Sequence, residues 1–221
     1  MKIQLPVIAF LVIIFTYQLP SLQAAQPKPE YKPWQINFFL ETTIYETLKP
    51  GKEKKDLAKV THFVEKYNTK VTCLRTNNIH SLRDITNQML TLIATHCTSL
   101  HTIQLSHCDK ITTAVLSTLI TRQTDLKEID LTGMSCITGK LINTILESCP
   151  LLTSLTLVEC TTITDKHLNY ICLNLPKLER LILSGSSGWS QAAIQNLRKA
   201  RPQLNIYTCF YDIITPSCSI S

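Results

Sequence analysis

The apolar residues of the chain recur every 26 positions over its last two thirds. Six rows of this period open with a leucine, at Leu74, Leu100, Leu126, Leu152, Leu178 and Leu204. A mostly apolar position follows three residues later and another two residues after that, giving L-x-x-L-x-L. The final spacing of two is the period of a β-strand, so each row predicts one short strand. In this register Asn77 and Tyr207 take the core position of the first and last rows.

A hydroxyl residue marks the predicted start of a helix in each complete row. These residues are Thr86, Thr112, Thr138, Thr164 and Ser190. Thr and Ser favour the N-cap position because the side-chain oxygen accepts a backbone N–H that has no partner in the helix. Apolar residues stand four and seven positions after each hydroxyl residue, as Leu90 and Ile93 do after Thr86. This spacing forms one apolar helix face, so each row reads as strand, turn and helix.

A unit of this size cannot bury its apolar face alone, so the rows must stack. Stacking places strands on the inner, concave side because the helix layer is wider. The predicted fold class is α/β, a leucine-rich-repeat solenoid (horseshoe) of about five to six repeats over residues 71–210. Since neighbouring contacts would be equivalent, removal of residues 126–151 should shorten the solenoid and preserve its fold.

Four cysteines keep the period of the repeat. Cys97 and Cys149 stand three residues before a row leucine, and Cys108 and Cys160 stand eight residues after one. The row from Cys149 to Asp165 resembles the cysteine-containing repeat of F-box/leucine-rich-repeat proteins, the substrate-recognition subunits of Skp–cullin–F-box ubiquitin ligases. The resemblance implies that these cysteines are buried, reduced thiols that pack as small apolar residues. The chain has nine cysteines in total, and those off the repeat positions include Cys136 and Cys218.

The segment before the repeats, residues 35–70, resembles an F-box in its apolar spacing. Asn37 stands where that motif has proline, and the lysine-rich loop 49–55 is longer than usual. Two interpretations remain open: an F-box that docks a Skp-type adaptor, and an ordinary helical cap on the first repeat. Both predict helices at about 35–48 and 54–67. The resemblance implies adaptor-binding residues Ile44, Tyr45, Leu48, Leu57, Phe63 and Tyr67.

Residues 1–24 have the pattern of a cleaved secretory signal peptide: Lys2, a short apolar run, then Ala24-Ala25. The run is shorter than a membrane span of roughly 20 residues, and an uncleaved anchor is the alternative. A proline-rich linker (25–34) follows, and residues 211–221 form a C-terminal tail. Export favours disulfides, whereas the repeat cysteines favour a reducing cytosol. A protein secreted by its maker that acts in the cytosol of a host cell satisfies both. The combination is similar to secreted F-box/leucine-rich-repeat effectors of gall-forming insects.

Charge and catalytic motifs add little. Only 17% of residues are charged and 44% are hydrophobic, which excludes a disordered chain, and the net charge of +6 is too dispersed to indicate nucleic-acid binding. His96-Cys97 and His107-Cys108 look like metal ligands or Cys–His pairs, but both cysteines already serve as repeat positions. We therefore expect no enzyme activity, no cofactor and no metal.

Function is then expected on a surface. The polar residues between the core leucines should lie on the concave face, acidic at its centre and apolar at Val158, Ile182 and Ile206. The expected target-binding residues are Gln104, Glu128, Asp130, Thr156, Val158, Arg180 and Ile182. The predicted function is a substrate-recognition adaptor of a Skp–cullin–F-box-type ligase that binds an unidentified protein target. The alternative is a secreted extracellular leucine-rich-repeat module with no link to a ligase.

Overall fold

The computed structural model describes Lys32, Ile36, Asn37, Leu40, Ile44, residues 57–76 and residues 85–208. The chain divides into two units, Met1–Tyr31 and Lys32–Ser221, and all described residues belong to the second. The predicted signal peptide and the tail 211–221 lie outside the described residues, as does all of the linker 25–34 except Lys32.

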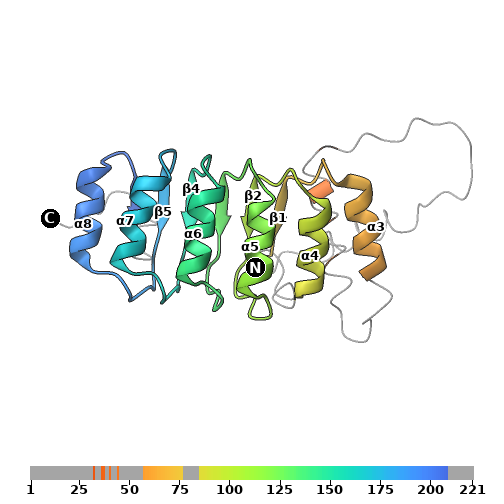
Figure 1. The fold of residues 1–221 in the computed structure, drawn as a ribbon, viewed down its shortest axis with the longest axis horizontal. Helices are drawn as coiled ribbons and strands as arrows, with labels where there is room; N and C mark the ends of the chain where they lie inside the picture. Colours follow the sequence, from red (N-terminus) through yellow and green to blue (C-terminus); the bar gives the residue numbers. More distant parts are fainter. Residues whose placement is uncertain are drawn as a thin grey trace, which may run out of the picture. The chain divides into compact units, whose positions relative to one another are not determined.

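Helices and strands alternate along the described chain (Figure 1). The helices are α3 (Leu57–Tyr67), α4 (Asn87–His96), α5 (Thr113–Thr121), α6 (Gly139–Ser148), α7 (Asp165–Asn174) and α8 (Gln191–Ala200). The strands are β1 (Cys73–Arg75), β2 (Thr102–Gln104), β3 (Glu128–Asp130), β4 (Ser154–Thr156), β5 (Arg180–Ile182) and β6 (Asn205–Tyr207).

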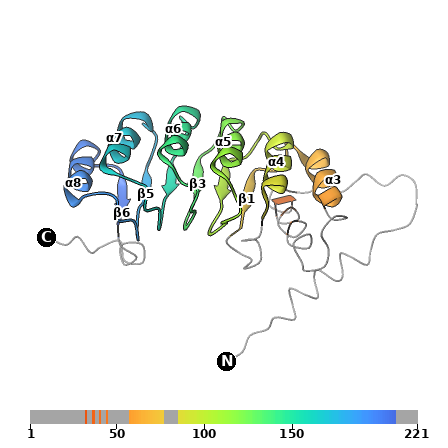
Figure 2. The same cartoon turned by 60° about the horizontal axis from the view of Figure 1, so that its bottom comes forward.

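The six strands form one parallel sheet in sequence order, and the helices form a second layer on one side of it (Figure 2). Each strand has a buried central residue, from Leu74 in β1 to Ile206 in β6, that packs toward the helices. The apolar helix faces close the core from the other side. This arrangement confirms the predicted leucine-rich-repeat solenoid.

The predicted helix starts are also confirmed. Thr86, Thr112, Thr138, Thr164 and Ser190 are the N-cap residues of α4 to α8. The Thr86, Thr138 and Ser190 hydroxyls each accept a hydrogen bond from the backbone N–H three residues later. Neighbouring caps are joined as well, because the Asp165 carboxylate accepts bonds from both the backbone N–H and the hydroxyl of Ser190.

The predicted register is wrong in the first row. Leu74 pairs with Ile103, so it is the centre of β1 and not the residue that opens the row. The step from Leu74 to Ile103 is three positions longer than the step from Ile103 to Ile129. The three additional residues fall between β1 and α4, because the α4 cap keeps the regular spacing of the repeat. Thr76, expected on the concave face, is buried, and its hydroxyl donates to the Gln104 carbonyl.

The predicted register is also wrong by one residue in the last row. Leu181 pairs with Ile206, and this step is one position shorter than the step from Leu155 to Leu181. Helix α8 still follows α7 at the regular spacing of the repeat, so the missing residue lies between Ala200 and Asn205. Ile206 is therefore in the core, only 7% exposed, and Tyr207 takes the half-buried position beside Ile182.

The segment before the first repeat covers the start of the solenoid. Ile36, Leu40 and Ile44 are helical and buried, which agrees with the predicted helix over 35–48 as far as these residues test it. The Asn37 side chain accepts hydrogen bonds from the backbone N–H groups of Thr72 and Cys73 and donates to the Thr72 hydroxyl. These N–H groups lie at the edge of the sheet, so Asn37 satisfies donors that no neighbouring strand pairs. Helix α3 extends the helix layer beside α4.

Candidate protein-binding surface

The side of the sheet away from the helices presents the first and third residues of each strand. We call this surface the sheet face (Figure 2). Its residues are Cys73, Arg75, Thr102, Gln104, Glu128, Asp130, Ser154, Thr156, Arg180, Ile182, Asn205 and Tyr207. All except Cys73 are half-buried or exposed. No described helix covers this side, so these side chains are accessible with respect to the described part of the chain.

Two carboxylates stand at the centre of the sheet face, on β3. The Glu128 carboxylate accepts a hydrogen bond from the Gln104 side chain at 2.9 Å. The Asp130 carboxylate accepts bonds from the Thr132 hydroxyl at 2.6 Å and the Thr132 backbone N–H at 3.0 Å. Both carboxylates are therefore held in a fixed position, which lowers the entropy lost when a partner binds them.

A groove runs along the start of strands β2 to β6, and we call it the strand-start groove. Its volume is about 400 Å³. It is lined by His101, Thr102, Lys127, Glu128, Thr153, Ser154, Glu179, Arg180 and Asn205. The side chains of Lys127, Glu179 and Arg180 are exposed and have no partner among the described residues. Unpaired charges of both signs at one groove are available to pair with a matching pattern of opposite charges on a partner.

Six of the seven predicted target-binding residues lie on the sheet face: Gln104, Glu128, Asp130, Thr156, Arg180 and Ile182. The seventh, Val158, does not, because it is buried at 5% exposure where the chain leaves β4. The predicted apolar end of the face is therefore smaller than expected. Ile182 remains there, Ile206 is in the core, and Tyr207 is added.

The sequence pattern missed the residues that precede each strand. Strand alternation would point His101, Lys127 and Glu179 toward the core. The regular pairing is interrupted at this position, since the N–H groups of Lys127 and Glu128 both donate to the His101 carbonyl, and the three residues line the strand-start groove. The charge of Lys127 and Glu179 at equivalent row positions was the signal that could have identified them.

The described members of the predicted adaptor-binding set do not lie on one surface. Ile44 is 1% exposed and is a core residue, so it cannot contact a partner in the folded chain. Tyr45 and Leu48 lie outside the described residues. Phe63 and Tyr67 are half-buried on α3, with ring centroids 4.8 Å apart.

Leu57 lies on a different flank of α3. Successive helix residues are rotated by about 100°, which puts Leu57 across the buried stripe of Val60 and Val64 from Phe63 and Tyr67. Leu57 lines an open hollow between α3 and α4 together with Leu92. A single partner surface on α3 could therefore use Phe63 and Tyr67, or Leu57, but not all three equally.

The repeat cysteines are buried thiols, as predicted. Cys108 and Cys160 are 1% and 2% exposed, and all seven described cysteines are free. Burial raises the pKa of the Cys97, Cys149 and Cys160 thiols to about 12. These thiols are neutral at pH 7, and a neutral thiol is a poor nucleophile and metal ligand. Among the described residues no group of three or more His, Cys, Asp or Glu side chains is placed to hold a metal ion.

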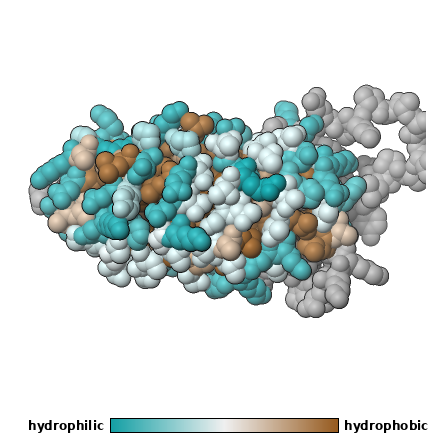
Figure 3. Space-filling view, in the orientation of Figure 1, coloured by the Kyte–Doolittle hydropathy of each residue, from teal (hydrophilic) through white to brown (hydrophobic). Residues whose placement is uncertain are grey.

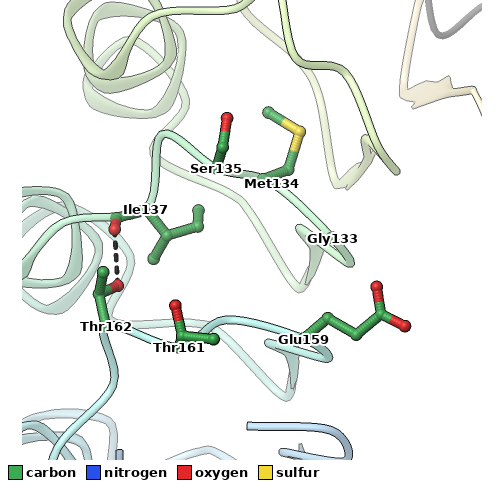
Figure 4. Close-up of a pocket in the computed structure, with 7 residues that line it drawn as sticks. All are labelled: Gly133, Met134, Ser135, Ile137, Glu159, Thr161 and Thr162. Carbon is green, nitrogen blue, oxygen red and sulfur yellow. Dashed lines mark hydrogen bonds between the residues drawn. The ribbon is translucent and has the colours of Figure 1, made fainter.

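A second hollow lies between the loops that follow β3 and β4 (Figure 4). The Thr162 hydroxyl bridges the two loops by donating to the Ile137 carbonyl. Glu159, the charged residue of this hollow, extends away from Thr161 and Thr162 (Figure 4). The polar groups do not converge on one point, so the hollow lacks the geometry of a ligand site.

The helix side mixes hydrophilic and hydrophobic residues without one dominant patch (Figure 3). Leu173 on α7 is 77% exposed, and Tyr170 on the same helix is 38% exposed with the Lys166 ammonium over its ring. Single exposed apolar residues of this kind are common and do not define a site. Within the described residues, no helix has the length and apolar character to cross a bilayer.

No protein-family model and no curated protein matches the chain. Among solved structures, it is similar to a chain in the crystal structure of the Rad7 and Elc1 complex from yeast. The similarity has 15% sequence identity and a TM-score of 0.49, and it covers 95% of this chain and 53% of that chain. The protein thus spans about half the length of this structural neighbour. Its assignment as a leucine-rich-repeat solenoid rests on its own parallel sheet and helix layer.

Proposed function

We propose that the chain is a non-catalytic binding protein that holds a protein partner on its sheet face. The observation that supports this most directly is the set of exposed charges without partners among the described residues, Lys127, Glu179 and Arg180, beside two ordered carboxylates. These charged groups form no ion pair within the described solenoid, whereas they can steer and orient a binding partner. Arg180 and Tyr207 would be the energetic anchors, because Arg and Tyr dominate the centres of protein interfaces.

The finer proposal is that the chain is a substrate-recognition adaptor of a Skp–cullin–F-box-type ubiquitin ligase. The cysteine-containing repeat supports it, and so do five buried thiols that would stay reduced in a cytosol. The adaptor would dock at α3, where Phe63 and Tyr67 form a half-exposed aromatic pair. The signal-like residues 1–24 would export the protein, and it would act in the cytosol of a host cell.

The alternative function is an extracellular leucine-rich-repeat module without a ligase. The signal-like N-terminus favours this alternative, because secreted proteins ordinarily remain outside the cell. Titration of free thiols in the secreted, unfolded protein separates the two. Nine free thiols per chain support action in a reducing compartment, whereas a set of closed disulfides supports the extracellular module.

The direct test has two arms in one pull-down from host extract. Phe63→Ala with Tyr67→Ala should abolish capture of a Skp homologue, and Arg180→Glu should abolish capture of the target while leaving Skp binding intact. Tyr170→Ala is the matched control, because it removes a partly exposed tyrosine from α7. If the wild-type chain captures a target but no Skp homologue, the ligase proposal fails and the binding-module function stands. If Arg180→Glu captures the same proteins as wild type, the sheet-face proposal fails.

A further inference from the structure

The strand-start groove carries four charges whose order reverses from one side to the other. On β3 the order along the chain is positive then negative, Lys127 followed by Glu128. On β5 it is negative then positive, Glu179 followed by Arg180. The parallel register aligns Glu128 with Ser154 and Ser154 with Arg180, so the residues that precede them align as well.

Strand β4 lies between the two charged strands and contributes only neutral residues, Thr153 and Ser154. It is the middle one of the five strands, β2 to β6, that line the groove. Neighbouring strands are about 4.8 Å apart, so the charges of β3 are about 10 Å from the charges of β5, with β4 midway between them. The groove thus has two positive and two negative charges at the corners of a rectangle, with equal charges on the diagonals.

This pattern is its own complement. Consider a second copy turned by a two-fold axis that runs along β4 in the plane of the groove. Such a rotation places β5 of the second copy opposite β3 of the first. Lys127 then faces Glu179 of the second copy, and Glu128 faces Arg180 of the second copy. We propose that the strand-start groove is a self-association surface that pairs two copies of this chain about a two-fold axis along β4.

Other occupants match the groove less well. Its four charges sum to zero, so an acidic segment would meet Glu128 and Glu179, and a basic segment would meet Lys127 and Arg180. Like charges placed together in an interface are unfavourable, which rejects partners of one sign. A second copy carries the required alternation by symmetry, and each pair of charges occurs twice in the dimer.

The dimer is held by exposed ion pairs, and exposed pairs are weak and screened by salt. We therefore expect a concentration-dependent equilibrium and not a permanent dimer. Glu128 and Arg180 also belong to the sheet face, so self-association and capture of a protein partner would compete for them. The self-association proposal itself does not depend on the proposed function.

Sedimentation equilibrium of the full chain at low ionic strength tests the proposal. The weight-average mass should rise with protein concentration toward twice the monomer mass. It should return to the monomer mass in about 1 M salt, where the Debye length is about 3 Å. Lys127→Glu and Glu179→Lys should each remain monomeric, because each variant puts like charges opposite one another across the axis. An equal mixture of the two variants should dimerise again. In the mixed dimer, the acidic group introduced by Lys127→Glu in one chain faces the lysine introduced by Glu179→Lys in the other.

Matched controls lie on the opposite side of the molecule. Lys140→Glu and Glu147→Lys make the same charge changes at positions of α6, so they should dimerise as the wild type does. The proposal is overturned if the wild-type mass does not change with concentration. It is equally overturned if the controls lose dimerisation, or if the mixture of Lys127→Glu and Glu179→Lys stays monomeric.

Discussion

Replacement of Gly133 by alanine tests how consecutive repeats fit together. Gly133 has a φ of +64°, in the left-handed region, and a side chain there costs about 1–2 kcal/mol. The position also faces the preceding repeat. A Cβ on Gly133 would lie 2.2 Å from Nδ1 and 2.3 Å from Cε1 of the His107 ring. The ring would have to move, and overpacking of this kind costs about 1–3 kcal/mol. Together the two effects predict a loss of about 2–5 kcal/mol.

Gly185 provides the matched control. It has a φ of +73°, so an alanine there carries the same backbone strain. Its nearest neighbour is the flexible Glu159 side chain, 3.1 Å from the built Cβ, which can move at little cost. Gly185→Ala should therefore lose only about 1–2 kcal/mol. The difference between the two variants measures the contact with the His107 ring.

The assay is urea unfolding followed by circular dichroism, with His107→Ala as the second arm of a double-mutant cycle. Without the ring, Gly133→Ala should cost no more than Gly185→Ala does in the wild type. Two results would refute the reasoning. One is an equal cost for Gly133→Ala and Gly185→Ala, and the other is a cost of Gly133→Ala that His107→Ala does not reduce.

Three further predictions use the same measurement. Gln123→Leu should cost about 2–4 kcal/mol of unfolding free energy, because the buried Gln123 side chain donates to the Cys97 carbonyl and accepts from the Leu100 N–H, and both would be left unpaired. Cys149 occupies the same position one repeat later, so an equal cost for Cys149→Ala would contradict this reason. Gly188→Ala should destabilise strongly, since a Cβ there lies 2.2 Å from the Ile163 carbonyl oxygen, which is backbone and cannot rotate away; a stability equal to wild type would be the contrary result. The stability should also fall as the pH rises above about 9, because the unfolded thiols ionise there while folded Cys97, Cys149 and Cys160, with a pKa of about 12, stay neutral. Each thiol adds a slope of at most about 1.4 kcal/mol per pH unit, so Cys149→Ala should flatten the profile, and an unchanged slope would count against buried neutral thiols.

The central repeats were predictable because one spacing determines several features at once. The row leucines, the N-cap hydroxyls and the buried cysteines all keep the same period between β2 and β5, so each feature supports the others. The end rows failed because a solenoid tolerates length changes in its loops. Three residues are added before α4 and one is lost after α8, and each change moves the strand without disturbing the helix cap. Apolar spacing counted from one end cannot detect such a change.

The candidate surface was less predictable than the core. Alternation identifies the residues of the sheet face but not the interrupted pairing just before the strands, so Lys127 and Glu179 were missed. The segment 36–67 shows a second limit. Its apolar spacing fits either an exposed docking ridge or a buried cap, and burial of Ile36, Leu40 and Ile44 is decided by contacts that no local pattern contains. Asn37, a departure from the F-box pattern, has a structural reason at the sheet edge.

A left-handed backbone position recurs once in each of four consecutive repeats, but its side chains alternate between large and absent. It is occupied in turn by His107, Gly133, Glu159 and Gly185, all with positive φ. Each large side chain lies over the glycine of the following repeat. The backbone N–H one residue later repeats the alternation, since Cys108 donates to the Met134 sulfur and Cys160 to the Ser186 hydroxyl. At this edge the structural unit is a pair of repeats, although the strands and helices repeat singly.

This alternation changes the expected result of deleting one row. Removal of residues 126–151 would place Glu159 where Gly133 now lies, so its Cβ would meet the His107 ring and cost about 1–3 kcal/mol. Removal of residues 126–177 would instead place Gly185 there and keep the fit. We therefore expect Glu159→Gly to stabilise the full-length protein by about 1–2 kcal/mol, because it relieves the left-handed backbone strain. In the one-row deletion it should stabilise by about 1–3 kcal/mol more, because it also removes the clash with the His107 ring. The measurement is urea unfolding of the full-length protein and of the one-row deletion, each with and without Glu159→Gly. If Glu159→Gly stabilises both backgrounds by the same amount, single repeats are interchangeable at this edge and the pairwise unit is wrong.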